Sequence, residues 1–363
     1  MNKAFAGLRV LDFTTTIAGP HCTRLLADLG ADVVKIEAPE GDVMRSRPPL
    51  RNGASSYFGQ LNAGKRSVVL DLKEQAGRAR ALELAAEADI VVEGYRPGVA
   101  DRLGIGYDAV RAVNESVIYC SVSGLGQDGP LSQASGHDIN YLAWSGALAP
   151  EGGPPREPAV PVADLSGGMA AAFAICAAVV RKLKTGEGER IDVAMADVLA
   201  TWTGAVAPQA EGTDEGARGV PPGYGTFETA GSEHVAVGVL TEDHFWRPLC
   251  SVLDLDDDIA SLSFVDRMAR GGELQTRVAD AIRTRNRDEL VGELLAVGVP
   301  VAPVFDRSAM VGLRHFVERR AVTTEDWADP ATGFPVRFVH HPATRREPPP
   351  EIDQHRGQRF RRR

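Results

Sequence analysis

Short apolar runs alternate with helix-like segments along the first third of the chain. The runs are rich in β-branched residues, and they cover residues 8–13, 32–36, 68–72, 90–93 and 117–122. Segments with helical periodicity separate them, at residues 21–29, 74–87 and 107–113. Strands that are apolar throughout must be covered on both faces, as helices cover a parallel sheet. The pattern therefore predicts an α/β domain with a parallel sheet.

A composition change near residue 208 predicts a domain boundary. Before it, we expect helices at 138–146, 165–184 and 196–203 and a strand at 190–193. The Gly- and Pro-rich stretch 208–225 has no periodicity and is typical of a crossover linker. After it, we expect a β-hairpin at 225–229 and 234–239, helices at 244–252, 273–284 and 287–297, and a strand at 301–305. These elements predict a smaller α/β domain.

The chain length of 363 residues fits two domains with an extended C-terminal segment. We predict a large domain over residues 1–205 and a small domain with its linker over residues 206–330. The remaining residues, 331–363, are proline-stiffened and are predicted to return to the large domain.

The charge balance argues against nucleic-acid and membrane binding. The chain has 40 Lys and Arg against 49 Asp and Glu, a net charge of −9, so its surface repels polyanions and anionic lipid. The basic end, from Arg356 to Arg363, is expected to be a solvated terminus with room for an interchain contact. Residues 167–180 form an apolar run of about 14 residues, shorter than a bilayer span, and are predicted to form a buried helix.

The four cysteines show neither a CxxC pair nor a neighbouring His pair, so neither a metal site nor a disulfide framework is expected. The N-terminus runs into a strand-like segment without the features of a secretion signal. We therefore expect a cytoplasmic protein.

Two basic loops point to a phosphate-bearing ligand. Lys65 and Arg66 precede one strand, whereas Arg96 and Arg102 follow another. Ligands bind beyond the carboxyl ends of parallel strands, which favours the position of Arg96 and Arg102. Each loop alone is explained equally well as a solvated basic surface. Two such loops in an acidic chain favour a phosphate ligand.

Asp164 is the leading candidate for chemistry. It lies at a predicted helix N-terminus, where an acidic residue is also explained as a helix cap. Gly167 and Gly168 follow it and are expected to let a substrate approach the backbone. The carboxylate could act as a nucleophile or as a general base. His137 also precedes a helix, and its alternative is an ordinary structural role. Glu242 begins a helix, where the helix dipole alone favours an acid.

At these motifs the chain resembles the family III CoA-transferases of the formyl-CoA and carnitine CoA-transferase type, a family that includes α-methylacyl-CoA racemases. The resemblance spans nearly the whole chain. It rests on these ordered segments: LRVLDFTTTIAGPHCTRLLADLGADVVKIEAPEGD, LNAGKRSVVLDLK, EGYRPGVADRLGIGYD, GLGQDGP, GHDINYLA, VADLSGG, TGEGERIDVAMADVL and GVPVAPVFD.

The resemblance implies a large Rossmann-like domain, a small domain and a homodimer of two interlocked rings. It implies an acyl-CoA thioester as substrate, a carboxylic acid as acceptor, and no permanently bound cofactor. Lys65, Arg66 and Arg102 would hold the CoA nucleotide and phosphates. Asp164 matches the catalytic aspartate, which in the transferases forms an aspartyl anhydride and then an aspartyl-CoA thioester.

The racemase branch is the alternative that the resemblance leaves open. There a histidine and the aspartate exchange the α-proton of a 2-methylacyl-CoA, and His137 and Asp164 occupy those positions. Glu242 approximately matches a glutamate that assists the histidine, although Thr241 looks inserted. The long segment 42–64 and the segment PPGYGTFET are transferase-like. Ala38 replaces an arginine common near the adenine, and the small domain lacks a glycine-rich loop found in formyl-CoA transferases.

These features rank the functions. We expect CoA transfer first and racemisation second. A non-catalytic CoA-binding protein is the third hypothesis, and the presence of Asp164 argues against it.

Overall fold

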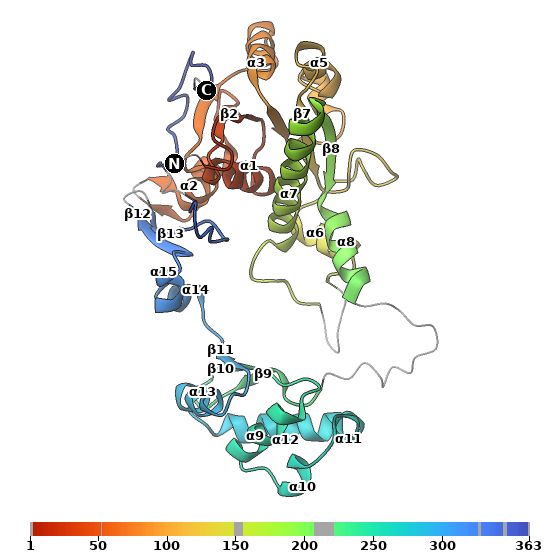
Figure 1. Ribbon diagram of the computed structural model, residues 1–363, viewed down its shortest axis with the longest axis vertical. Helices are drawn as coiled ribbons and strands as arrows, with labels where there is room; N and C mark the ends of the chain where they lie inside the picture. Colours follow the sequence, from red (N-terminus) through yellow and green to blue (C-terminus); the bar gives the residue numbers. More distant parts are fainter. Residues whose placement is uncertain are drawn as a thin grey trace. The chain divides into compact units, whose positions relative to one another are not determined.

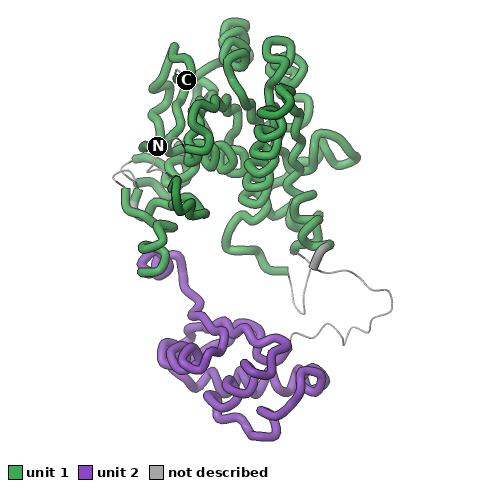
Figure 2. The backbone as a smooth tube through the Cα atoms, viewed as in Figure 1, with its two compact units in different colours: residues 1–208, 314–363 green, residues 209–313 purple. Residues whose placement is uncertain are grey.

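The computed structural model describes residues 3–51, 53–148, 155–206, 221–325, 328–343 and 347–361. The chain divides into two compact units (Figure 2). Unit 1 comprises residues 1–208 and 314–363, and unit 2 comprises residues 209–313. The predicted crossover at 208–225 lies mostly outside the described residues.

The small unit ends earlier than the sequence predicted. Residues 314–330, which we assigned to the small domain, cluster with unit 1. The reason is a contact between distant segments: the side chain of Gln60, in helix α2 (Ser56–Asn62), donates to the carbonyl oxygen of Pro330 at 2.9 Å and accepts from the N–H of Thr332 at 3.0 Å. A single sequence does not show this pairing.

Unit 1 is built on a six-stranded sheet in which all neighbouring strands are parallel (Figure 1). The strands are β1 (Arg9–Asp12), β2 (Asp32–Glu37), β5 (Arg66–Val69), β6 (Ile90–Glu93), β7 (Ile118–Ser123) and β8 (Glu189–Ala194). Their order is β5-β2-β1-β6-β7-β8, so the chain reverses its direction across the sheet between β1 and β6. The predicted parallel α/β class is confirmed, and this order is that of a doubly wound nucleotide-binding fold.

Helices cover both faces of this sheet. Successive residues of a strand point to opposite faces of the sheet, so Val10 and Leu11 of β1 belong to two different apolar cores. One core holds residues of α1 (Ala18–Asp28), α6 (Asp138–Trp144), α7 (Val162–Thr185) and α8 (Met195–Val206). The other holds residues of α3 (Gln75–Glu87), α4 (Val99–Arg102) and α5 (Tyr107–Val113). Unit 1 also contains α2 (Ser56–Asn62), η1 (Val43–Ser46), β3 (Leu50–Arg51), β4 (Ala54–Ser55), α15 (Arg314–Glu318), β12 (Val322–Glu325) and β13 (Ala328–Thr332).

Helix α7 is longer than its apolar run suggested. The run of uncharged residues at 167–180 is too short to span a bilayer. The helix has 24 residues because it extends beyond this run at both ends, into turns that contain Asp164 at the start and Lys182 and Lys184 at the end. By length and composition alone it meets the criteria for a membrane span, and half of its most apolar window is buried inside the protein.

The C-terminal segment covers the edge of the sheet at β5. The N–H of His355 donates to the Ser67 carbonyl at 3.0 Å, and the Ser67 N–H donates to the His355 ring at 3.2 Å. The Val69 N–H donates to Asp353 at 2.9 Å. Phe360 is 6% exposed and joins the core beneath α3 and α5. The backbone of this end is therefore docked, which corrects the expectation of a simple solvated terminus.

Unit 2 packs helices on a three-stranded antiparallel sheet of order β11-β10-β9. Its strands are β9 (Tyr224–Glu228), β10 (His234–Gly238) and β11 (Val301–Pro303), and its helices are α9 (Asp243–Val252), α10 (Asp257–Ala260), α11 (Phe264–Ala269), α12 (Gly271–Arg283), α13 (Arg287–Ala296) and α14 (Arg307–Val311). Trp246 lies in its core against the buried guanidinium of Arg267, which also donates to Asp243 at 2.7 Å.

Candidate functional site

The candidate site lies where the strand order reverses, between β1 and β6. In sheets of this type ligands bind beyond the carboxyl ends of the two strands at that point. Strand β1 leads into loop 13–17, and β6 leads into loop 94–98. The two loops are neighbours, because a Cβ atom built on Gly94 would lie 3.7 Å from the Thr14 side chain.

Helix α7 brings Asp164 toward this crevice. Asp164 is the third residue of the helix, and α7 packs closely along α1, which begins directly after loop 13–17. The approach is tightest at Gly168, one turn after Asp164, where an added Cβ would lie 2.5 Å from the carbonyl oxygen of Ala18. The first turns of α1 and α7 therefore lie side by side.

The glycines after Asp164 have a different role from the one we predicted. Gly167 and Gly168 are both buried. A Cβ on Gly167 would lie 2.5 Å from the Met195 side chain of α8, and one on Gly168 would meet α1. The two glycines let helices pack against α7, so they do not expose its backbone to a substrate.

The carboxyl group of Asp164 is half-buried and electrostatically perturbed. Its pKa is raised to about 6: burial is the largest cause, the negative charge of Asp138 adds to the rise, and His137 opposes it. The backbone N–H of Asp164 donates to Oδ1 of Asp138 at 3.0 Å. At pH 7 the carboxylate is still mostly ionised, but it is much closer to its titration point than an ordinary aspartate.

Asp138 is the functional candidate that sequence reasoning missed. It is the first residue of α6, where an acid is expected from the helix dipole alone. Its carboxylate also caps the N-terminus of α7, 26 residues further along the chain. Only the adjacency to His137 in the sequence hinted at this role, because the contact with Asp164 is tertiary.

Replacing Asp138 by asparagine is expected to move the acidic limb of the pH–rate profile to lower pH. The amide keeps an oxygen for the Asp164 N–H but removes the charge that raises the Asp164 pKa. The wild-type limb should lie near pH 6, and kcat/KM at pH 5 relative to pH 8 should rise in the variant. Asp108→Asn, an exposed first-turn acid of α5, is the matched control. If the acidic limbs of the wild type and of Asp138→Asn lie at the same pH, the charge of Asp138 does not raise the Asp164 pKa.

The structure brings His137 and Tyr141 toward Asp164, and Arg96 toward Tyr141. His137 is the exposed N-cap residue of α6, and its charge lowers the Asp164 pKa. The Tyr141 hydroxyl donates to the Gly136 carbonyl at 2.7 Å. Burial and, to a smaller extent, the charge of Asp164 raise the pKa of Tyr141, while Arg96 of loop 94–98 opposes the rise. Two helices and one loop thus contribute polar groups around the carboxylate.

Lys65 has a structural environment that the sequence did not reveal. Its side chain is fully buried. Its ammonium group has four oxygen partners: Asp12 Oδ2 at 3.0 Å, Thr23 Oγ1 at 2.7 Å, Asn62 Oδ1 at 2.9 Å and the Pro20 carbonyl at 3.1 Å. Burial lowers its pKa to about 8. Lys65 therefore lies under the start of α1, not in a solvated loop.

Arg66 is also occupied by internal partners. It forms a bidentate pair with Asp32 at 2.7 and 3.0 Å and donates to the Arg359 carbonyl at 2.9 Å. The partners of Lys65 and Arg66 are distant in sequence. The sequence alone therefore indicated a solvated basic loop at these two residues. Phosphate binding by Lys65 and Arg66 stays a prediction, and it would require these contacts to rearrange.

Arg102 and Glu242 occupy different surroundings. Arg102 ends α4, just after loop 94–98, and its side chain is exposed to solvent, so it can reach a phosphate without breaking a buried ion pair. Glu242 belongs to unit 2, where it is the N-cap residue of α9 and accepts from the Leu240 N–H at 3.1 Å. Its partnership with His137 stays a prediction.

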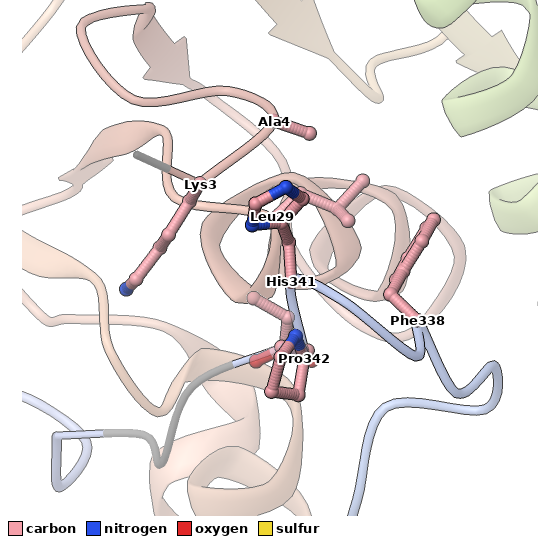
Figure 3. Close-up of a pocket in the computed structure, with 8 residues that line it drawn as sticks. Lys3, Ala4, Leu29, Phe338, His341 and Pro342 are labelled. Atoms are coloured by element: carbon pink, nitrogen blue, oxygen red, sulfur yellow. The ribbon is translucent and has the colours of Figure 1, made fainter. Parts of the chain in front are cut away.

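A separate cavity of about 160 Å³ lies between the N-terminal segment, the end of α1 and the C-terminal segment (Figure 3). It is lined by Lys3, Ala4, Asp28, Leu29, Phe338, His341, Pro342 and Ala343. None of the six predicted site residues lines it. Within the part of the chain that the structure describes, no cluster of three or more His, Cys, Asp or Glu residues is arranged to hold a metal ion.

The chain is similar to several known proteins along most of its length. Acetyl-CoA:oxalate CoA-transferase of Acetobacter aceti is 33% identical, over 87% of this chain and 84% of that protein. Succinyl-CoA:mesaconate CoA-transferase of Haloarcula hispanica is 33% identical, over 98% of this chain and 95% of that protein. The crystal structure of a CAIB/BAIF family protein from Brucella suis superposes with a TM-score of 0.85 at 27% identity, covering 98% of both chains.

The family assignment rests on the same extent of the chain. The model of CoA-transferase family III matches residues 5–356, which include the six-stranded sheet, the loops after β1 and β6, and Asp164. The resemblance seen in the sequence motifs is confirmed: the chain is an enzyme that belongs to CoA-transferase family III.

Proposed function

We propose that this enzyme transfers CoA from an acyl-CoA donor to a carboxylic acid, with Asp164 as the nucleophile. The observation that carries the proposal is the half-buried Asp164 carboxylate in the first turn of α7, beside the crevice at the strand reversal. A nucleophilic carboxylate must be ionised and poorly solvated at once. A pKa raised by burial to about 6 meets both conditions at pH 7.

The proposed reaction exchanges acyl groups without changing the number of thioester bonds. An Asp164 oxygen attacks the thioester carbon, the C–S bond breaks, and CoA leaves as the thiolate. The thiolate then attacks the aspartyl carbonyl of the resulting anhydride, which releases the donor acid and leaves an aspartyl-CoA thioester. The acceptor carboxylate attacks the aspartyl carbonyl of this thioester, its C–S bond breaks, and CoA thiolate leaves as a second anhydride forms. The thiolate then attacks the acceptor's acyl carbon and breaks the C–O bond of that anhydride to Asp164. Asp164 is regenerated as a carboxylate.

The surroundings of Asp164 suit these steps. The N-terminal end of α7 carries a partial positive charge, which stabilises the oxyanion formed at each attack. Asp138 fixes the start of α7 through the Asp164 N–H, so the carboxylate is held in place. We propose that Arg102 binds the CoA phosphates from the loop side of the crevice.

The relatives suggest the class of acceptor. Oxalate and mesaconate, which appear in the names of the two CoA-transferases above, are dicarboxylic acids. We therefore propose a short dicarboxylic acid as the acceptor for this chain.

We also propose that the enzyme works as an interlocked homodimer in the cytoplasm. Apolar side chains of α7 are exposed at helical spacing: Met169, Phe173, Val180 and Leu183. A second copy that covers this stripe would remove it from water. The four cysteines are free thiols, which suits a reducing compartment.

Mass spectrometry of the thioester pool tests the proposed reaction. The purified chain is incubated with acetyl-CoA, succinyl-CoA or formyl-CoA and with a panel of mono- and dicarboxylic acids. We expect the CoA thioester of a dicarboxylic acid to form while the donor is consumed in equal amount. Thioester hydrolysis without a new acyl-CoA for any pair would overturn CoA transfer.

The position of His137 supports one second candidate, α-proton exchange on a 2-methylacyl-CoA. The charge of His137 lowers the pKa of Asp164. Such an interaction is expected for two neighbouring groups of which one removes the α-proton and the other returns it. Incubation in deuterated water separates the two functions, because a racemase labels the α-carbon with no acceptor acid present. Absence of deuterium from the recovered thioester would exclude this candidate.

A further inference from the structure

A buried ion pair supports the loop at the end of β1. Lys35 lies on β2, and its fully buried ammonium group donates to the carbonyl oxygen of Thr14 at 2.6 Å. The same ammonium pairs with Asp42 Oδ2 at 2.7 Å, and the Asp42 side chain is fully buried as well. Thr14 belongs to loop 13–17, which follows β1 at the strand reversal, the place where sheets of this type bind ligands.

The loop is held from a second side by Asp12. Its Oδ1 accepts from the N–H of Thr14 at 2.9 Å and from the Thr14 hydroxyl at 2.6 Å. Two residues further on, Thr16 has a φ angle of +64°, a left-handed conformation that a β-branched residue rarely adopts. A residue in such a conformation persists only where its surroundings enforce it. Lys35 and Asp12 fix Thr14, two residues before this position.

The ion pair continues as a buried polar network. The N–H of Asp42 donates to Glu37 Oε2 at 2.9 Å, and the Glu37 carboxylate binds Arg45 through two contacts of 2.7 Å. The Ser67 hydroxyl donates to Glu37 Oε1 at 2.5 Å and accepts from the N–H of Asp353 at 3.0 Å. The network therefore joins loop 13–17 to the docked C-terminal segment.

Stability alone does not account for the Lys35–Asp42 pair. Removing two charges from water costs free energy that their attraction often fails to recover, and apolar replacements of buried pairs are frequently neutral or stabilising. Hydrogen bonds from such a pair do, however, fix the group they hold in one place. Here the group held is the backbone of a loop that faces the candidate ligand crevice.

We propose that Lys35 and Asp42 are positioning residues for the acyl-CoA substrate. They hold the Thr14 carbonyl, and with it loop 13–17, in the conformation that binds the thioester. The inference rests on the proposed function, since the crevice must take acyl-CoA. It predicts that the pair contributes to substrate binding more than to folding.

The double variant Lys35→Met/Asp42→Asn tests this inference in the full chain. Methionine keeps the length of the lysine stem, and asparagine keeps the oxygen that accepts from the Met44 N–H at 2.8 Å. No unpaired charge is left behind. We expect KM for the acyl-CoA donor to rise by about 10-fold or more, kcat to fall less than about 3-fold, and Tm to stay within a few degrees. Hydrogen exchange at residues 13–17 should accelerate, with residues 32–37 unchanged.

Arg277→Met/Asp256→Asn is the matched control. It removes an exposed ion pair of unit 2, in which the charged atoms are 2.9 Å apart, by replacing the cation with methionine and the aspartate with asparagine. It should leave KM, kcat and loop exchange unchanged. If the double variant does not fold, Asp42→Asn alone is the second test: it leaves the buried Lys35 ammonium without its charged partner, so Tm should fall. At temperatures where this single variant is folded, KM should rise more than about 3-fold because the ammonium that holds Thr14 is no longer anchored, and an unchanged KM would contradict the positioning role.

The outcomes separate this inference from the proposed function. Calorimetric titration with CoA itself accompanies the kinetics. If the wild type transfers CoA or binds it, while the folded variant has an unchanged KM or Kd, the positioning role is wrong and the proposed function stands. If the wild type binds CoA without transferring it, a 10-fold weaker Kd in the variant still supports positioning. If the wild type neither binds nor transfers CoA, both proposals fail.

Discussion

Replacing Asp164 by asparagine is expected to lower kcat for CoA transfer by about 10⁴-fold or more, because removal of a covalent nucleophile abolishes its chemical step. The amide has nearly the same size, and the backbone N–H that donates to Asp138 remains. Burial already disfavours the charged form of Asp164, as its raised pKa shows, so the variant should be at least as stable as the wild type at pH 7. Initial rates at saturating donor and acid, with thermal unfolding alongside, provide the measurement.

Asp197→Asn is the matched control for this variant. Asp197 is the third residue of α8, as Asp164 is of α7, and it is exposed to solvent. Its replacement should leave kcat unchanged within about 2-fold, because it holds no reacting group. If a well-folded Asp164→Asn protein kept more than about a tenth of wild-type kcat, a covalent role of this residue could not be sustained.

Replacing Phe360 by alanine is expected to lower the Tm of unit 1 by about 10 °C. A buried Phe→Ala change costs about 3–5 kcal/mol, and each kcal/mol corresponds to about 2–4 °C in a domain of this size. Phe360 is 6% exposed in the core beneath α3 and α5, and it anchors the segment that covers strand β5. Differential scanning calorimetry of the full chain measures the shift.

Ile352→Ala is the control for the Phe360 variant. It removes an apolar side chain from the same segment, but Ile352 is 45% exposed, so its Tm should change by less than about 2 °C. Loss of the segment would also expose the backbone of an edge strand, and aggregation on heating should therefore increase in Phe360→Ala. Equal Tm values for the two variants would show that the C-terminal segment does not support the sheet.

The sheet could be predicted from sequence because its strands are buried on both faces. Residues 90–93 are apolar except for the last, and the predicted strand coincides with β6. The predicted helix at 107–113 coincides with α5, since one apolar stripe faces the core. The short helix α2 was not predicted, because its sequence SYFGQLN has Gly59 in the middle and Asn62 at the end, two residue types that favour turns over helices. The docking of residues 353–360 on β5 depends on contacts nearly 300 residues apart.

The candidate site was predictable in part. Asp164 and His137 were selected from their local motifs, and the structure brings them near each other. The role of Asp138 could not be predicted, because an acid at a helix start has a sufficient local explanation. The burial of Lys65 was hidden for a related reason: its partners come from β1, α1 and α2. Sequence patterns reveal residue types and periodicity, whereas burial of a charge depends on tertiary neighbours.

Trapping with hydroxylamine during turnover tests the central claim most directly. Hydroxylamine attacks an activated aspartyl carbonyl, in an anhydride or a thioester, and converts that side chain to a hydroxamate. Peptide mass spectrometry should find the hydroxamate at Asp164 when acyl-CoA is present, and at no carboxylate when acyl-CoA is omitted. An enzyme that turns over in hydroxylamine while Asp164 stays unlabelled would contradict the covalent route.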